Sequence, residues 1–262
     1  MVHLSRNSWK AAIEQVVGAR LPGQPDQYID EVSASPCYAV GARRVVGMTV
    51  YHYAKLLTGA VVDISNQGRG IGNSLILDEQ NTSAVPASVA IGSKTLPILD
   101  AASVAHAYSG GVVTVYGAAE VQRFDIVDST LSDGTNVVLT LARPVRVAIP
   151  AGTFTALVRN PYSAVRGLAA IATSLAPVVG VPQTYAAASN YLWLATWGLA
   201  NIVQGEALNG VGGPDVCFNP GDGAVWKAAT VHTAGNSWQR AGHMILEQTG
   251  GIDSNVWLEI DP

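Results

Sequence analysis

Histidines are the side chains in this sequence whose spacing could most directly build a metal site. The five histidines are His3, His52, His106, His232 and His243. None lies in a His-Glu-x-x-His motif or beside cysteines at zinc-finger spacing, so the pattern predicts no metal site. His232 and His243 could meet across a hairpin, but paired surface histidines are much commoner than paired ligands.

Nucleophile and phosphate-binding motifs are the next candidates. The chain holds neither a Gly-x-Ser-x-Gly elbow nor a Ser-x-x-Lys motif. Residues 68–72, Gly-Arg-Gly-Ile-Gly, lack the ending of a phosphate loop and predict an ordinary loop. Acidic residues such as Asp128 and Asp133 lie near turns, where they are usually solvated. A glycosidase would need two facing carboxylates. We therefore predict no enzyme and no cofactor, with a polysaccharide-degrading enzyme as the weakest alternative.

The aromatic run Tyr191–Trp197 is the most distinctive stretch. On a strand, Trp193 and Trp197 share one face, and tryptophans at this spacing could stack against sugars. The alternative, which we favour, is a central strand buried on both faces. Gly198 would then end or bulge the strand.

Ionised side chains are scarce. Of the 262 residues 48% are apolar, enough for a sizeable core, and only 13% are charged, against roughly 25% in ordinary soluble domains. Because a lone monomer needs charged surface to stay in solution, the shortage indicates that subunit contacts cover much of the surface; a large core is the alternative. The net charge of −4 and the absence of a basic stripe argue against nucleic-acid binding.

Cysteine usage and apolar segments bear on the compartment. Cys37 and Cys217 lie far apart and form no dense disulfide framework, so we expect a reducing compartment and two buried free thiols; the sequence leaves open whether they pair. We find no secretory signal. The apolar segment Leu168–Val181 is too short to span a bilayer, and Pro177 interrupts it. The sequence therefore predicts a soluble protein with no membrane partner.

Residues 1–31 predict an N-terminal arm that contains a short amphipathic helix ending at Gly18. The apolar side chains on its one face are Trp9, Ala12, Ile13, Val16 and Val17. A linker rich in proline and glycine follows at residues 21–27. A helix on such a tether cannot bury its stripe alone, so we expect it to dock on a neighbouring subunit, with its own body as the alternative.

Beyond the arm, short runs of β-branched and alternating residues predict strands. These runs are Val45–Tyr53, Val112–Tyr116, Arg123–Val127, Val137–Ala142, Val145–Ile149, Thr155–Val158, Tyr191–Trp197 and Val256–Ile260. Asp133-Gly134 predicts a hairpin turn between two of them. The predicted fold class is all-β, with β-sandwich or β-barrel modules.

Composition shifts divide the chain into four parts. The arm at residues 1–31 is followed by a first β module at 32–166. A connector at 167–183 follows, and a C-terminal β-barrel-like module occupies 184–262. Residues 168–204 contain no charged side chain, so this stretch must be buried internally or against a partner.

The order of several of these motifs resembles that of tailed-phage virion proteins of the head decoration, or cement, type. The stretches that carry the resemblance are Tyr38–Lys55, Thr135–Ile149, Val158–Tyr162, Tyr191–Ala200, Arg240–Leu246 and Val256–Ile260. The last two are similar to the closing hairpin of such proteins. The N-terminal helix has no counterpart in this pattern.

The resemblance implies a β-rich virion protein on the capsid surface, made in the host cytoplasm, with no cofactor and no active site. Its partners would be the major capsid protein and copies of itself, as a homotrimer by analogy with other decorators. The expected contact residues are Trp9, Ile13, Val16, Val17, Trp193 and Trp197. A tail, baseplate or receptor-binding component that recognises host-surface glycans is the alternative.

Overall fold

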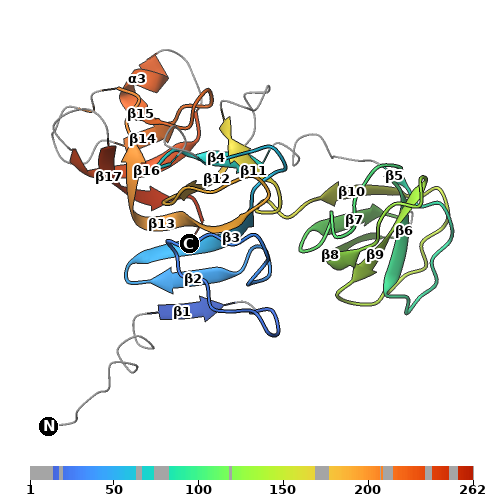
Figure 1. Ribbon diagram of the computed structural model, residues 1–262. Helices are drawn as coiled ribbons and strands as arrows, with labels where there is room; N and C mark the ends of the chain where they lie inside the picture. Colours follow the sequence, from blue (N-terminus) through green and yellow to red (C-terminus); the bar gives the residue numbers. More distant parts are fainter. Residues whose placement is uncertain are drawn as a thin grey trace, which may run out of the picture. The chain divides into compact units, whose positions relative to one another are not determined.

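The computed structural model describes residues 14–17, 20–62, 67–73, 83–117, 120–168, 177–206, 208, 215–233, 238–247 and 253–261. The chain forms two compact units. Unit 1 comprises Met1–Ser74 and Tyr162–Pro262, and unit 2 comprises Leu75–Pro161. Both consist mainly of antiparallel strands (Figure 1), which confirms the predicted predominance of β structure.

Unit 1 contains an eleven-stranded sheet in the described part of the chain. Its strands are β1 (Glu14–Val17), β2 (Arg43–Val46), β3 (Thr49–Lys55), β4 (Ile71–Asn73), β11 (Val165–Gly167), β12 (Val178–Pro182), β13 (Tyr191–Val203), β14 (Asp215–Phe218), β15 (Val225–Lys227), β16 (Arg240–Glu247) and β17 (Asp253–Glu259). The main path runs β1-β2-β3-β13-β17-β16-β14-β15, and β12, β4 and β11 continue from β13 beside it. A short helix that the sequence did not predict, α3 (Ala228–Thr233), follows β15.

Unit 2 contains a six-stranded sheet. Its strands are β5 (Ser83–Ala84), β6 (Thr95–Leu99), β7 (Val112–Tyr116), β8 (Val121–Ser129), β9 (Asn136–Leu141) and β10 (Phe154–Val158). The order is β5-β10-β7-β8-β9-β6, and the two terminal strands lie near each other. The sheet is therefore curled (Figure 1). Strict alternation of buried and exposed residues along β7, β8 and β10 gives it one core face and one solvent face.

Unit 2 is an insertion in a hairpin of unit 1. Asn73 of β4 and Val165 of β11 pair directly and antiparallel, although 91 residues lie between them in the sequence. The whole of unit 2 lies in the connection between them. Hairpin tips tolerate insertions well because loop-closure entropy grows only slowly with length. Each unit accordingly has its own hydrophobic core.

This arrangement differs from the predicted division of the chain. The predicted first module at 32–166 combines strands of both units, and the connector at 167–183 contains β12, a fully buried strand of unit 1. Composition indicated a break there because the segment is uncharged. In the structure the described strand Val178–Pro182 is buried inside a sheet, so its lack of charge marks core rather than a boundary.

Most of the predicted strands lie in β3, β7, β8, β9, β10, β13 and β17, but two runs differ. The run Val45–Tyr53 is a hairpin, in which β2 and β3 pair directly. The run Val145–Ile149 is not a strand. The buried Gln122 side chain accepts hydrogen bonds from the backbone amides of Arg146 and Val147 and donates one to the carbonyl of Val147. This side chain occupies the place of a neighbouring strand.

The hairpin predicted at Asp133-Gly134 is confirmed, because it joins the antiparallel pair β8 and β9. Gly134 has φ +93°, a conformation that glycine adopts without strain. The Asp133 carboxylate accepts hydrogen bonds from the amides of Thr135 and Asn136. The turn is therefore held by a side chain of the predicted type.

The predicted N-terminal helix is wrong where the structure describes it. Residues Glu14–Val17 form β1, which pairs antiparallel with Arg43–Val46. Two consecutive valines favour a strand, and a short isolated helix is marginal in water, so an available sheet edge prevails over the helical spacing. The expected contact residues Trp9 and Ile13 lie outside the described residues. The linker at residues 21–27 is not a free tether either, since Gln27 is 3% exposed.

None of the helices in the described ranges is long and apolar enough to cross a membrane.

Candidate functional site

The aromatic strand β13 is a core element of unit 1. Trp193 and Ala195 lie in one hydrophobic cluster, whereas Leu192 and Leu194 lie in another on the opposite side. The favoured interpretation, a central strand buried on both faces, is therefore confirmed. Trp193 is fully buried, so it offers no surface to a partner or a sugar, and its assignment as a contact residue is wrong.

The regular pairing of β13 with β3 is interrupted in the second half of β13. The register of its pairing with β3 shifts between Ala195 and Trp197. Gly198 has φ +86°, and a Cβ there would lie 2.0 Å from the carbonyl oxygen of Met48. The bulge thus lies before Gly198, which pairs regularly with Leu258, and the strand continues to Val203, so Gly198 does not end it as one of the two predicted outcomes required. Trp197 remains half-buried.

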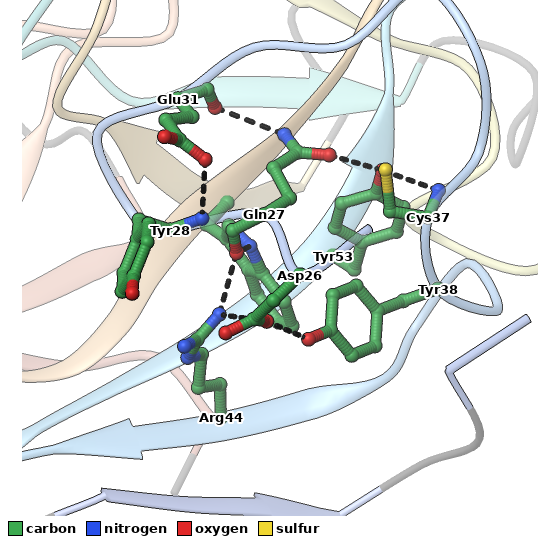
Figure 2. Close-up of polar contacts among 9 residues, drawn as sticks. Asp26, Gln27, Tyr28, Glu31, Cys37, Tyr38, Arg44 and Tyr53 are labelled. Carbon is green, nitrogen blue, oxygen red and sulfur yellow. Dashed lines mark hydrogen bonds and ion pairs between the residues drawn. The ribbon is translucent and has the colours of Figure 1, made fainter. Parts of the chain in front are cut away.

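A polar cluster holds the segment before β2 against the sheet (Figure 2). The Gln27 side chain accepts a hydrogen bond from the Tyr53 hydroxyl at 2.6 Å and donates to the carbonyls of Glu31 and Tyr191 at 2.9 and 3.1 Å. The backbone carbonyl of Gln27 accepts from the indole Nε1 of Trp193 at 3.0 Å. This one residue therefore joins the N-terminal segment to β3 and β13.

Arg44 completes this cluster from β2. It is 1% exposed, donates to the Gln27 carbonyl, and lies over the Trp193 ring at 5.5 Å. Its guanidinium also lies 3.5 Å from the Asp26 carboxylate. That carboxylate in turn accepts a hydrogen bond from the Tyr38 hydroxyl (Figure 2). Burial lowers the pKa of Arg44 and raises the pKa of Tyr38. Both groups are engaged within the fold, so the cluster is structural.

A second buried cluster has the residue types of a catalytic triad. Nδ1 of His52 lies 3.1 Å from Oγ1 of Thr196, and Nε2 lies 3.8 Å from the Asp261 carboxylate. However, Thr196 is fully buried, and its hydroxyl donates to the Asp261 carbonyl at 2.7 Å. The ring of His52 is stacked on Tyr162, with centroids 4.8 Å apart. The hydroxyl cannot attack a substrate, so this cluster ties residue 261 to β3 and β13.

A histidine–aspartate pair in unit 2 likewise lacks a hydroxyl that could act as a nucleophile. Nδ1 of His106 lies 2.6 Å from the Asp128 carboxylate. The Ser109 hydroxyl donates to that carboxylate at 2.7 Å, not to the imidazole. Burial raises the pKa of Asp128, but the hydrogen bonds from His106 and Ser109 lower it by more. The carboxylate orders the loop before β7, and no activated nucleophile results.

Metal ligation receives no support from the described ranges, where no group of three or more His, Cys, Asp or Glu side chains could hold an ion. His232 lies in α3 and His243 in β16. The two cysteines, Cys37 and Cys217, are free and buried, which confirms the expected thiols. Gly70 of the glycine-rich loop packs against Phe218 and the Gly223 backbone, so this loop is part of the core.

The solvent face of unit 2 carries an exposed apolar row. Phe154 of β10 pairs directly with Tyr116 of β7, which pairs with Val121 of β8. Their exposed fractions are 62%, 52% and 58%. Directly opposed residues on neighbouring strands share a face and contact one another, so the three side chains form one continuous row. Ala84 of β5 pairs with Phe154 and extends the row to a fourth strand.

This row, here named the Phe154 row, is unusual for a solvent-facing sheet. The next positions on the same face are Ala156, Thr114 and the exposed Arg123, which separate the row from the exposed Val158 and Val127 further along the strands. Contiguous exposed apolar surface commonly marks a protein interaction site. Sequence reasoning noted these strands but not their outward residues, although the alternation of β7 and β10 identifies an apolar residue at each outward end.

The other expected contact residues have mixed outcomes. Val16 and Val17 lie in β1, the terminal strand of the main path in unit 1. Trp197 lies on the face of β13 opposite the core, where it pairs with Glu259. The four expected residues that the structure describes therefore lie outside the Phe154 row.

No family model matches the chain, and no curated protein or solved structure matches it.

Proposed function

We propose that the protein is a non-enzymatic structural component of a virus particle, a decoration or cement protein that binds the major capsid protein and copies of itself. The observation that supports this proposal best is the Phe154 row, which exposes three large apolar side chains on adjacent strands. The low charge content of the chain has the same implication, since only 13% of residues are charged.

Because a capsid repeats the same binding site, a small contact surface on each subunit is sufficient for stable binding. Full cover of Phe154, now 62% exposed, would remove about 120 Å² from water, which stabilises a contact by about 3 kcal/mol. A capsid presents the same site many times, and an oligomer that engages several sites gains affinity through effective concentration. In this proposal the curled sheets act as barrel- or sandwich-type modules, and the protein is a homotrimer.

Cosedimentation with purified capsids of the encoding virus tests the proposal. Wild-type protein should saturate the particles at hundreds of copies, as counted by quantitative mass spectrometry. A tail or receptor-binding component, the alternative, would be present in few copies. Failure of the wild type to bind capsids would contradict the decoration role.

The contact surface is tested separately with Phe154→Ser. We expect this variant to bind up to about 100-fold more weakly per contact, because it loses about 3 kcal/mol of apolar burial. Ile91→Ser is the matched control, since Ile91 is 67% exposed in a turn outside the row. Equal binding by wild type and Phe154→Ser would remove the row from the contact.

A further inference from the structure

One part of the sheet of unit 1, at β13, β16 and β17, combines tryptophans with charged groups on the face opposite the core residues Ala200, Val256 and Leu258. Trp197 and Leu199 of β13 pair with Glu259 and Trp257 of β17, and Trp257 pairs with His243 of β16. Residues between these positions, such as Ala200, Val256 and Leu258, belong to the hydrophobic core. Alternation therefore places Trp197, Leu199, Trp257, Glu259 and His243 together on the opposite face, here named the Trp257 face.

Aromatic surface runs across this face. Trp197 and Trp257 are diagonal neighbours on adjacent strands, because Trp197 is opposite Glu259 and Trp257 is opposite Leu199. Such diagonals lie about 7–8 Å apart and within reach of aromatic side chains. The His243 ring is nearly parallel to the Trp257 ring, at 20°, with centroids 6.4 Å apart. Leu199 is 39% exposed and Trp197 and Trp257 are both half-buried, so each tryptophan keeps part of its surface toward solvent.

An ion-pair network lies directly beside these rings. Arg240 contacts the carboxylates of Asp215 and Glu259 at 2.9 and 2.7 Å, and His243 lies 3.3 Å from Glu259. The side chains of Arg240 and Asp215 are more than half exposed. Each ionic group thus keeps hydrogen-bonding capacity toward solvent, while its partners hold it in place.

We infer that the Trp257 face binds a neutral saccharide. The apolar C–H face of a pyranose fits against the Trp257 and Trp197 rings, and its hydroxyls donate to Asp215 and Glu259 and accept from Arg240. The groups are fixed before binding, which reduces the entropic cost of association.

Other ligand classes fit this face less well. The two carboxylates around one guanidinium repel phosphate, which disfavours a nucleic acid. An apolar protein surface would strip water from three ionic groups without replacing their hydrogen bonds, which is costly, whereas hydroxyls replace water one for one. This inference is independent of the capsid role and concerns a different unit from the Phe154 row.

Native affinity electrophoresis of the full chain tests the inference. Gels contain hydroxyethyl cellulose, xylan, dextran or galactomannan as neutral probes, and alginate as an anionic one. We expect wild-type protein to be retarded by at least one neutral polysaccharide, and Trp257→Ala to lose at least tenfold in affinity. Asp215→Ala, which alters an exposed side chain, should lose severalfold in affinity. It is the second test of the face if the tryptophan variant fails to fold. Tyr185→Ala, which alters an exposed tyrosine of unit 1 that belongs to neither the Trp257 face nor the Phe154 row, is the matched aromatic control and should migrate as wild type.

Four results would overturn the inference. The first is wild-type migration that no neutral polysaccharide changes. The second is equal retardation of wild type and both face variants, which would locate binding elsewhere. The third is retardation by alginate alone, abolished by salt, which would indicate a charge effect. The fourth is a change of oligomeric state in Asp215→Ala without any saccharide binding by the wild type, which would make the face a contact between copies of the chain.

Discussion

Replacement of Gln27 by alanine should lower the free energy of unfolding of unit 1, although the residue lies in a segment that resembles a linker in sequence. The side chain makes three hydrogen bonds, and the most important is to the fully buried Tyr53 hydroxyl. Without it that hydroxyl loses its acceptor, which costs about 1–3 kcal/mol. The Tyr191 carbonyl retains the amide of Ser33 as a donor. With the lost packing of the side chain, we expect a total destabilisation of about 3 kcal/mol.

Tryptophan fluorescence during urea unfolding measures this change in unit 1 alone, because all six tryptophans lie outside residues 75–161. Gln24→Ala, which alters a half-buried glutamine of the same segment, is the control and should change the free energy of unfolding by less than about 0.5 kcal/mol.

A double-mutant cycle with Tyr53→Phe makes the Gln27 test specific. Once the hydroxyl is absent, Gln27→Ala should cost at least about 1 kcal/mol less than it does in the wild type. A destabilisation below about 1 kcal/mol for Gln27→Ala, or additive effects in the cycle, would refute the reasoning.

Three further predictions follow from the same structure. Asp100→Ala should destabilise unit 2 by about 2–3 kcal/mol, because the buried Tyr108 hydroxyl donates to this carboxylate; far-UV circular dichroism should reveal the change while the tryptophan midpoint stays fixed. Burial lowers the pKa of His52 below its usual 6.5, so the free energy of unfolding of unit 1 should fall as pH drops below about 6.5, and His52→Gln should flatten that dependence. Cys37 and Cys217 are buried, so Ellman's reagent should react with neither thiol before urea unfolds unit 1; immediate reaction would contradict their burial.

Strands β7, β8, β9 and β10 of unit 2 and the turn at Asp133-Gly134 were predictable because their determinants are local, whereas β5 and β6 were not predicted. Alternation, β-branched residues and a turn dipeptide act over a few residues and need no distant partner. The run Val145–Ile149 shows the limit of this reasoning. Its β-branched residues resemble those of a strand, but the side chain of Gln122, more than twenty residues away, takes the backbone hydrogen bonds at its centre, and only its two ends bond to backbone.

The candidate surfaces were less accessible to sequence analysis. The Phe154 row needs the register that places residues 116, 121 and 154 side by side, and a shift by one residue would bury them instead. The Trp257 face likewise needs Trp197, His243 and Asp215 to align on strands whose sequence order differs from their spatial order. The expected contact residues were chosen from single segments, so they included the core residue Trp193.

The amino-acid sequence by itself determined that this chain is rich in strands, poor in charge and equipped with two buried thiols, because composition and short-range periodicity carry that information. Only the tertiary structure decided that unit 2 is inserted between β4 and β11, that Gln27 anchors an apparent linker, and that Glu14–Val17 form a strand. These outcomes depend on pairings between residues far apart in sequence. Such pairings are selected by the burial of shared surface and by the completion of backbone hydrogen bonds, and neither is encoded in any one segment.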